Sequence, residues 1–306
     1  MTDITTFPVL FTSGGVPLTG TVYRLGDDLT GRQPAVLVTG SWLTVKEQMA
    51  HHYASALAAR GLTAMTFDFT GFGQSGGELR QAELPSRKIA DIAAAAAFAS
   101  TLSFVRPGGV GYLGVCASAQ YGLAAVAQGA RISSYASVAG WFHDTRSVAP
   151  FYGGDAGVAA RIQRGAEATR RYLQDGEVVM VPAYENGNDR AGMFFELDYY
   201  ADAGRGAVPE WPNRMAELSW LPWLTFSGHA LAEHVAVPSL FVHSDGCVFP
   251  DAIESLRTRM RGPVEVLWGE GGQTDFYDLP AQVAFAVEAL VPHFTGTLGR
   301  AEDLVA

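Results

Sequence analysis

Cys116 stands in the stretch of the sequence whose spacing best suits nucleophilic chemistry. The pattern Gly114-Val115-Cys116-Ala117-Ser118 places a small residue two positions before and two positions after the thiol. An abrupt turn from a strand into a helix exposes its central residue, and only small residues fit at those two positions. A frame centred on Ser118 has the bulky Gln120 at one of them, so Cys116 is the better nucleophile. A buried core cysteine is the simpler alternative, because unpaired cysteines are among the most buried residues.

The elements around this stretch predict a mostly parallel sheet. Val110 to Val115 is an apolar strand that leads into an Ala-rich helix after Cys116. Strands and helices alternate over the first 140 residues, which is typical of a sheet covered by helices on both faces. The expected strands are 7–11 and 16–24 (a hairpin), 34–39, 62–67, 110–115 and 134–138, and the expected helices are 45–60 and 86–100.

The alternation stops after residue 140 and resumes near residue 236. One helix, 156–173, is followed by turn-rich sequence with many aromatic residues. A strand at 239–243, a helix at 251–261, a strand at 264–268 and a last helix after Pro280 then complete the pattern. We therefore predict a core of residues 1–140 and 236–306, with residues 141–235 inserted as a cap. The aromatic residues suit both the walls of a pocket and the core of a small subdomain.

The composition limits the class of protein. Of 306 residues, 48% are hydrophobic and 17% are charged, which is typical of a globular protein. A formal charge of −10 disfavours nucleic acid as a partner. No secretory signal or bilayer-length apolar run is visible, so we expect a soluble, cytoplasmic protein with a small-molecule substrate and no membrane partner.

No cofactor or metal is expected from the motifs. The glycine-rich segment 71–77 lacks the lysine and the spacing of a phosphate-binding loop, and it predicts a tight connection between a strand and a helix. Two cysteines are too few for a disulfide framework. Cys247 is expected at the same edge of the sheet as Cys116, where a redox pair is conceivable.

Four motifs resemble those of α/β-hydrolases, and more narrowly those of the cysteine-nucleophile branch. They are Val45-Lys-Glu-Gln48, the segment Asp68 to Ser75, Gly114 to Ser118, and Gln273-Thr-Asp-Phe-Tyr-Asp278. They are similar to motifs of dienelactone hydrolase and of fungal polyketide transferases. The resemblance covers the sheet and helices on both sides of the insertion but not the cap. It implies a doubly wound, mostly parallel α/β sheet with a cap inserted after the sixth strand.

The resemblance also implies roles for single residues. Cys116 corresponds to the nucleophile, and the backbone N–H groups of Ala117 and of Ser41 or Trp42 correspond to the oxyanion hole. The acid belongs in the loop after the seventh strand, where Asp245 is the candidate and Asp251 the weaker alternative. The family's histidine should follow the last strand, yet Gln273 stands there, and no histidine occurs from residue 265 to residue 292.

His143 is the histidine that we predict to enter the site instead. It follows the sixth strand closely, so Trp141, Phe142 and His143 start at the edge where the thiol is expected. We assign Trp141, Phe142 and Gln273 to substrate binding. A hinge histidine that is hydrogen-bonded to the cap is an equally good interpretation of His143.

A cysteine tolerates the loss of a base better than a serine does. At the N-terminus of a helix its pKa is expected to fall, because the dipole favours the thiolate. Water, however, attacks an acyl-enzyme poorly without a general base. We therefore expect an enzyme that transfers acyl groups, or hydrolyses an ester, thioester or related carbonyl compound, of the kind found in secondary metabolism. A non-covalent cyclase or lyase and an inactive ligand-binding homologue are the alternatives.

Overall fold

A computed structural model describes residues 3–298 of the chain. Eight strands form one sheet in the order β1-β2-β4-β3-β5-β6-β9-β10. They are β1 Ile4–Ser13, β2 Val16–Leu25, β3 Gln33–Thr39, β4 Thr63–Phe67, β5 Val105–Val115, β6 Ile132–Val138, β9 Ser239–Gly246 and β10 Val264–Gly272. β2 runs antiparallel to both β1 and β4, and every other pair of neighbours is parallel. The predicted fold class is thereby confirmed.

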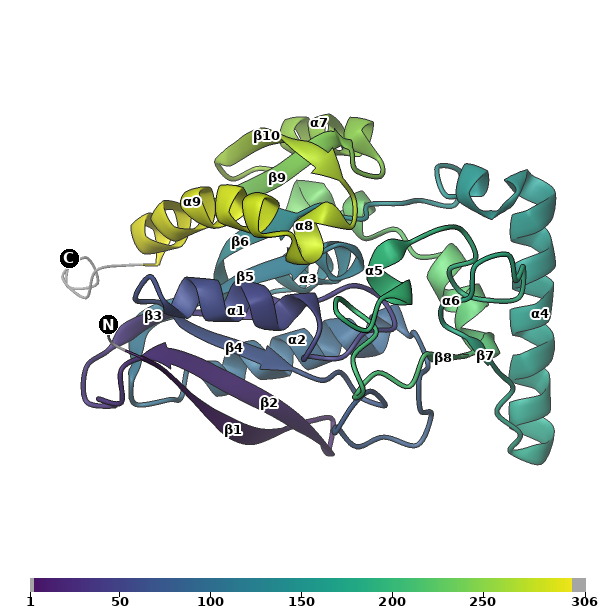
Figure 1. Cartoon of the computed structure of the whole chain (residues 1–306), viewed down its shortest axis with the longest axis horizontal. Helices are drawn as coiled ribbons and strands as arrows, with labels where there is room; N and C mark the ends of the chain where they lie inside the picture. The colour runs from purple at the N-terminus through teal and green to yellow at the C-terminus, as the bar shows by residue number, and fades with distance from the viewer. Residues whose placement is uncertain (1–2, 299–306) are drawn as a thin grey trace.

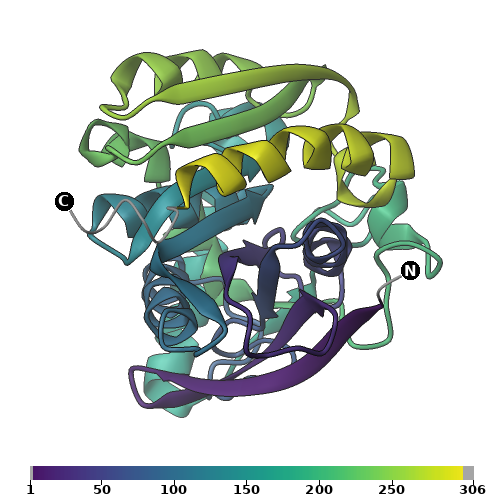
Figure 2. The same ribbon diagram turned by 90° about the vertical axis from the view of Figure 1, so that its left-hand side faces the viewer.

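Helices cover both faces of this sheet (Figures 1 and 2). α1 (Met49–Ala58) and α9 (Pro280–Thr297) pack together on one face, and α2 (Pro85–Ala99) and α3 (Ala117–Ala127) pack together on the other. α7 (Pro250–Arg259) connects β9 to β10, and the single turn α8 (Asp275–Asp278) precedes α9. None of the helices within residues 3–298 has the length and apolar character needed to span a bilayer.

Small residues let α3, the helix after Cys116, lie close to the sheet. α3 is buried along nearly its whole length. A Cβ at Gly122 would lie only 1.9 Å from the Tyr112 ring of β5, so the position excludes any larger residue. Parallel strands buried on both faces are continuous apolar runs, and β3 and the second half of β5 have that pattern.

An insertion of residues 139–238 joins β6 to β9. It contains η1 Ala149–Tyr152, α4 Gly154–Asp175, β7 Met180–Pro182, α5 Asp198–Ala201, β8 Arg214–Ala216, η2 Glu217–Ser219, α6 Trp220–Leu224 and η3 Gly228–His234. The strands β7 and β8 form a separate antiparallel pair. The long helix α4 follows the outer edge of the molecule (Figure 1), while Tyr200, Trp220 and Trp223 belong to the same hydrophobic core as the sheet.

Two of the boundaries that differ from the predicted ones lie near the thiol. The helix expected from residue 45 begins at Met49, because residues 41–48 form a turn in which the Val45 N–H donates to the Gln48 side chain at 2.9 Å. The strand expected at 264–268 continues to Gly272 in parallel pairing with β9. Both differences lie at the edge of the sheet where Cys116 stands.

The glycine-rich segment 71–77 encloses a carboxylate of the chain. The side chain of Asp68 accepts the backbone N–H groups of Lys46 and Gln74 at 2.9 Å and 3.0 Å. A Cβ at Gly73 would lie 2.3 Å from that carboxylate. The glycines therefore allow a tight turn around Asp68.

Candidate functional site

Cys116 occupies a strained turn between β5 and α3. Its φ of 59° and ψ of −124° lie where residues with side chains are rare. The Cys116 N–H donates to Val138 O at 3.1 Å, and its carbonyl accepts the Trp141 N–H at 3.0 Å, so β6 holds the turn in place. A Cβ at Gly114 would lie 2.5 Å from the Ala119 backbone, so this flanking position requires glycine. These contacts give the turn the backbone geometry that is typical of a nucleophile elbow.

Ser118, the competing nucleophile, points away from this site. It is fully buried, and its hydroxyl donates to Thr39 O at 2.9 Å. That contact ties α3 to the end of β3. Of the two residues, only Cys116 lines a cavity near the elbow.

A small, largely enclosed cavity of about 60 Å³, which we call the closed cavity, lies beside the Cys116 thiol. Its walls come from the core and from the insertion and are mostly apolar; they include Ser41, Trp42, Trp141, Tyr152, Phe195, Tyr200, Gln273 and Tyr277. A second, open cavity of about 630 Å³ lies in the insertion, and Tyr200 lines both. The thiol itself is only 3% exposed, so the closed cavity is the space that a reacting group would occupy.

Two backbone N–H groups near the thiol donate to no oxygen of the described residues. Within the described residues, the Trp42 N–H donates to no acceptor, and the Ala117 N–H, at the start of α3, faces only the Cys116 sulfur. The Ser41 N–H, by contrast, donates to the Met49 sulfur at 3.3 Å. Of the two predicted alternatives in the loop after β3, Trp42 is therefore the one whose N–H has no acceptor among the described residues.

Burial dominates the electrostatics of the thiol. It raises the pKa of Cys116, although hydrogen bonds from Ser41, Tyr277, the Ala117 N–H and Gln273 each lower it. The Ser41 hydroxyl lies 3.1 Å from the sulfur. The expectation of a lowered pKa is therefore wrong in direction, because desolvation outweighs the helix terminus. The thiol is protonated at neutral pH but is surrounded by donors that would stabilise a thiolate.

Gln273 lies beside the thiol, where the family resemblance places a histidine. Its amide nitrogen donates to Ala139 O at 2.7 Å and to the Tyr277 hydroxyl at 3.1 Å, and its oxygen accepts the Val248 N–H at 3.1 Å. These contacts fix the amide. A glutamine in this position donates hydrogen bonds but does not act as a general base at neutral pH.

His143 is not brought to Cys116. Its Nδ1 accepts from Trp141 Nε1 at 2.9 Å and from Gln120 Nε2 at 3.1 Å, and its Nε2 donates to Trp223 O at 2.9 Å. Burial lowers its pKa to about 4. Both ring nitrogens are thus engaged in holding the insertion against α3, as expected of a hinge histidine. No histidine within residues 3–298 lines the closed cavity.

Asp245 and Phe142 also lie away from the cavity. Asp245 is exposed at the end of β9, and its carboxylate accepts the Trp268 indole N–H at 3.2 Å. Its alternative, Asp251, is exposed in the first turn of α7. Phe142 is buried with its ring edge against Phe241. The structure therefore brings together Cys116, Ala117, Ser41, Trp42, Trp141 and Gln273 of the predicted site residues.

Sequence patterns missed the phenols of the site. Tyr277 belongs to the Gln273–Asp278 motif. It lies four residues after Gln273, a spacing that brings two side chains together when the segment is helical. Tyr152 and Tyr200 come from the insertion, whose path no spacing rule predicts. Cys247 does not line the cavity, and both cysteines are free.

Comparisons with known proteins agree with this fold. No family model matches the chain. The uncharacterized protein YcjY of Escherichia coli K12 is 27% identical over 288 residues, 89% of this chain and 91% of its own length. The polyketide transferase claH of Penicillium crustosum is 30% identical over 116 residues, 38% of each chain. The crystal structure of alpha/beta hydrolase GrgF from a Penicillium species superposes with a TM-score of 0.79 at 19% identity, covering 96% of this chain and 99% of that one.

Proposed function

We propose that this chain, an enzyme of the α/β-hydrolase fold, carries an acyl group on Cys116 and passes it to an acceptor other than water. The observation that carries the proposal is the setting of the thiol. It stands on a strained turn beside the Trp42 and Ala117 backbone amides and a closed cavity, and no histidine of the described residues lines that cavity. The similarity to a protein named polyketide transferase, over part of the chain, supports this choice.

In the first step the sulfur attacks the carbonyl carbon of an ester or thioester. The backbone N–H groups of Trp42 and Ala117 bind the oxygen as it becomes negative. The bond to the leaving oxygen or sulfur then breaks, and that atom takes the proton of the thiol. The products are an acyl-thioester on Cys116 and a free alcohol or thiol, so atoms and charge balance.

In the second step a nucleophile of the acceptor attacks the acyl-thioester. Attack by water is slow because water needs a base to remove its proton, and Gln273 supplies none. An amine, a thiol or a hydroxyl of the same substrate is held close to the carbonyl and needs less assistance. The cavity walls are mostly apolar and thus also disfavour bulk water. Transfer and intramolecular ring closure are the outcomes expected.

One observation favours a second candidate function. Burial raises the pKa of the Cys116 thiol, so its reactive form is scarce at neutral pH. A reaction that needs the two amides to stabilise an enolate or alkoxide, but needs no covalent bond, also fits this site. Such a cyclase or lyase would retain its turnover after loss of the sulfur.

The test is the mass of the intact protein after mixing with a small acyl thioester, such as the N-acetylcysteamine thioester of a short-chain acid. We expect one acyl group per chain, absent in Cys116→Ala and retained in the matched control Cys247→Ala. Release should be slow in buffer and fast when an amine or thiol is added. An unlabelled wild type, or hydrolysis that Cys116→Ala performs equally well, would contradict covalent transfer.

A further inference from the structure

The loop after β3, residues 40–44, carries one of the two proposed oxyanion amides in an unfavourable conformation. Leu43, the residue after Trp42, has a φ of 60° although it is not glycine, and it is fully buried. A leucine rarely adopts this left-handed region, because its Cβ approaches the following carbonyl. The surrounding structure must therefore hold the loop in this shape.

Hydrogen bonds hold both sides of Leu43. Its N–H donates to the Glu83 carboxylate at 2.9 Å, and its carbonyl accepts the Trp211 indole N–H at 2.7 Å. Glu83 comes from the segment that leads into α2, whereas Trp211 comes from the insertion. The loop is thus fixed from the core on one side and from the insertion on the other.

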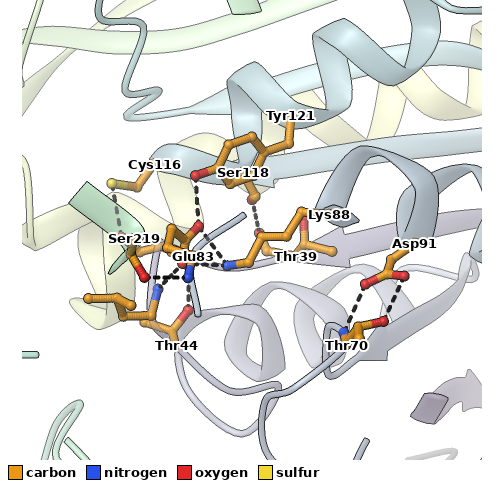
Figure 3. A network of polar contacts seen from close by, with 12 residues as sticks. Thr39, Thr44, Thr70, Glu83, Lys88, Asp91, Cys116, Ser118, Tyr121 and Ser219 are labelled. Atoms are coloured by element: carbon orange, nitrogen blue, oxygen red, sulfur yellow. Dashed lines mark hydrogen bonds and ion pairs between the residues drawn. The ribbon is translucent and has the colours of Figure 1, made fainter. Parts of the chain in front are cut away.

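Glu83 also contacts the helix that carries the second amide. The Tyr121 hydroxyl, one turn after Ala117 on α3, donates to the Glu83 carboxylate at 2.7 Å. Figure 3 shows the carboxylate between the loop and the helix, with Cys116 to one side. One buried side chain therefore binds both elements that present the oxyanion amides, although it does not line the cavity.

Lys88 pairs with this carboxylate. Its side-chain nitrogen lies 2.8 Å from Glu83, and 4.6 Å and 4.4 Å from the ring centroids of Phe69 and Phe72. Both charged groups are almost fully buried. A buried ion pair of this kind contributes little net stability compared with apolar residues of similar size. Its presence behind the site therefore calls for a reason other than stability.

We propose that Glu83 is a positioning residue that sets the distance between the Trp42 and Ala117 amides. Glu83 acts through Leu43 and Tyr121 and touches no substrate. The inference rests on the proposed function, since it needs an oxyanion that these amides bind. It follows that reactions in which an oxyanion forms depend on Glu83, whereas reactions at the same sulfur without an oxyanion do not.

Two reactions of Cys116 separate these cases. Acylation by the thioester passes through an oxyanion. Alkylation by iodoacetamide does not: the sulfur displaces iodide from carbon, a carbon–sulfur bond forms, and the thiol proton passes to the buffer. Both reactions need the thiolate of the same sulfur, so the ratio of the two rates cancels any change in the thiolate fraction. Cys247→Ala serves as the background, so that only one thiol reacts.

The decisive variants are Glu83→Leu/Lys88→Met, which removes the pair and the acceptor, and Glu83→Gln/Lys88→Met, which removes the charges but keeps an acceptor oxygen. We expect the first to slow acylation by about 10- to 100-fold, since loss of one oxyanion donor costs up to about 10³-fold. Its alkylation should stay within about twofold of the background, because no oxyanion forms. The second variant should recover most of the acylation rate.

Parallel loss of both rates, or no loss of either, would overturn the proposal. Tyr121→Phe gives a milder test if the apolar variant does not fold, because it removes only the contact to α3. It should slow acylation severalfold and leave alkylation unchanged, and an unchanged ratio would contradict the role of Glu83. A background protein that is alkylated but never acylated would instead refute the proposed function, and this inference with it.

Discussion

Two buried polar clusters differ in how completely their groups are paired: the Cys116 cluster lines the closed cavity, and the Glu83–Lys88 cluster does not. In the Glu83–Lys88 cluster, each carboxylate oxygen has a donor and the two charges neutralise each other. In the Cys116 cluster, donors surround a neutral thiol, the Trp42 amide is free, and the Tyr200 hydroxyl has no partner among the described residues.

The Glu83–Lys88 cluster has the pairing of a structural cluster, whereas the Cys116 cluster has the unpaired groups expected of a binding site. Buried polar groups without partners are costly, so a protein retains them where function requires them. An acyl oxygen that gains negative charge would supply the missing acceptor at the Cys116 cluster. The Glu83–Lys88 cluster needs no further hydrogen-bond partner. In our proposal it holds the Trp42 and Ala117 amides in place.

Breaking the Glu83–Lys88 ion pair should have the largest effect, on the free energy of unfolding. Lys88→Met leaves the Glu83 carboxylate buried without its counter-ion, so we expect a loss of about 3–5 kcal/mol in the free energy of unfolding. Denaturant unfolding measures it. Glu83→Gln/Lys88→Met, which leaves no charge, should lose much less. Equal losses in the two variants would show that packing, not charge, stabilises this region.

Adding a base to the Cys116 cluster should have the next largest effect. Gln273→His places an imidazole beside the thiol, where it can remove a proton from water. We expect hydrolysis of the acyl-enzyme to rise by about 100-fold, the lower range for general base catalysis. The decay of the acyl mass measures it, and Gln273→Asn, which retains an amide, is the matched control. A histidine variant no faster than the asparagine variant would contradict the assigned position.

The pH dependence of alkylation tests the charge state of the thiol. The thiolate is the reactive form, and burial raises the pKa of Cys116 above its ordinary value. The thiolate fraction, and with it the rate, should therefore rise about tenfold per pH unit from pH 7 to pH 9 without levelling. The iodoacetamide rate in Cys247→Ala measures this. A plateau below pH 8 would mean that the surrounding donors outweigh burial.

The smallest effect is expected at Asp245. Its carboxylate is exposed and contacts the Trp268 indole, not the cavity. Cys116 of Asp245→Asn should therefore be acylated at a rate within about twofold of the wild-type rate. This is usual for a substitution at an exposed residue away from a site. The acylation burst measures it. A tenfold loss would show that the residue reaches the thiol in a state other than this one.

The sequence predicts the sheet and the elbow well, because both depend on local patterns. Alternating apolar strands and helices specify the layers, and the small residues around Cys116 specify the turn. The placement of His143 depends instead on the path of the insertion, which contacts at long range determine. The sequence does not predict the role of Glu83 and Lys88, for another reason. Charged residues beside a helix suggest a solvated surface, and only the tertiary structure shows that both are buried.

The burial of Lys88 has a wider consequence for the proposed acyl transfer. The chain has only two lysines, and Lys46, like Lys88, is buried in an ion pair, in its case with Asp68. Arginine supplies every other positively charged side chain apart from histidine, and its guanidinium stays protonated. No lysine amine is therefore exposed to capture stray acyl groups from thioesters, and reagents that label surface lysines should leave these two untouched.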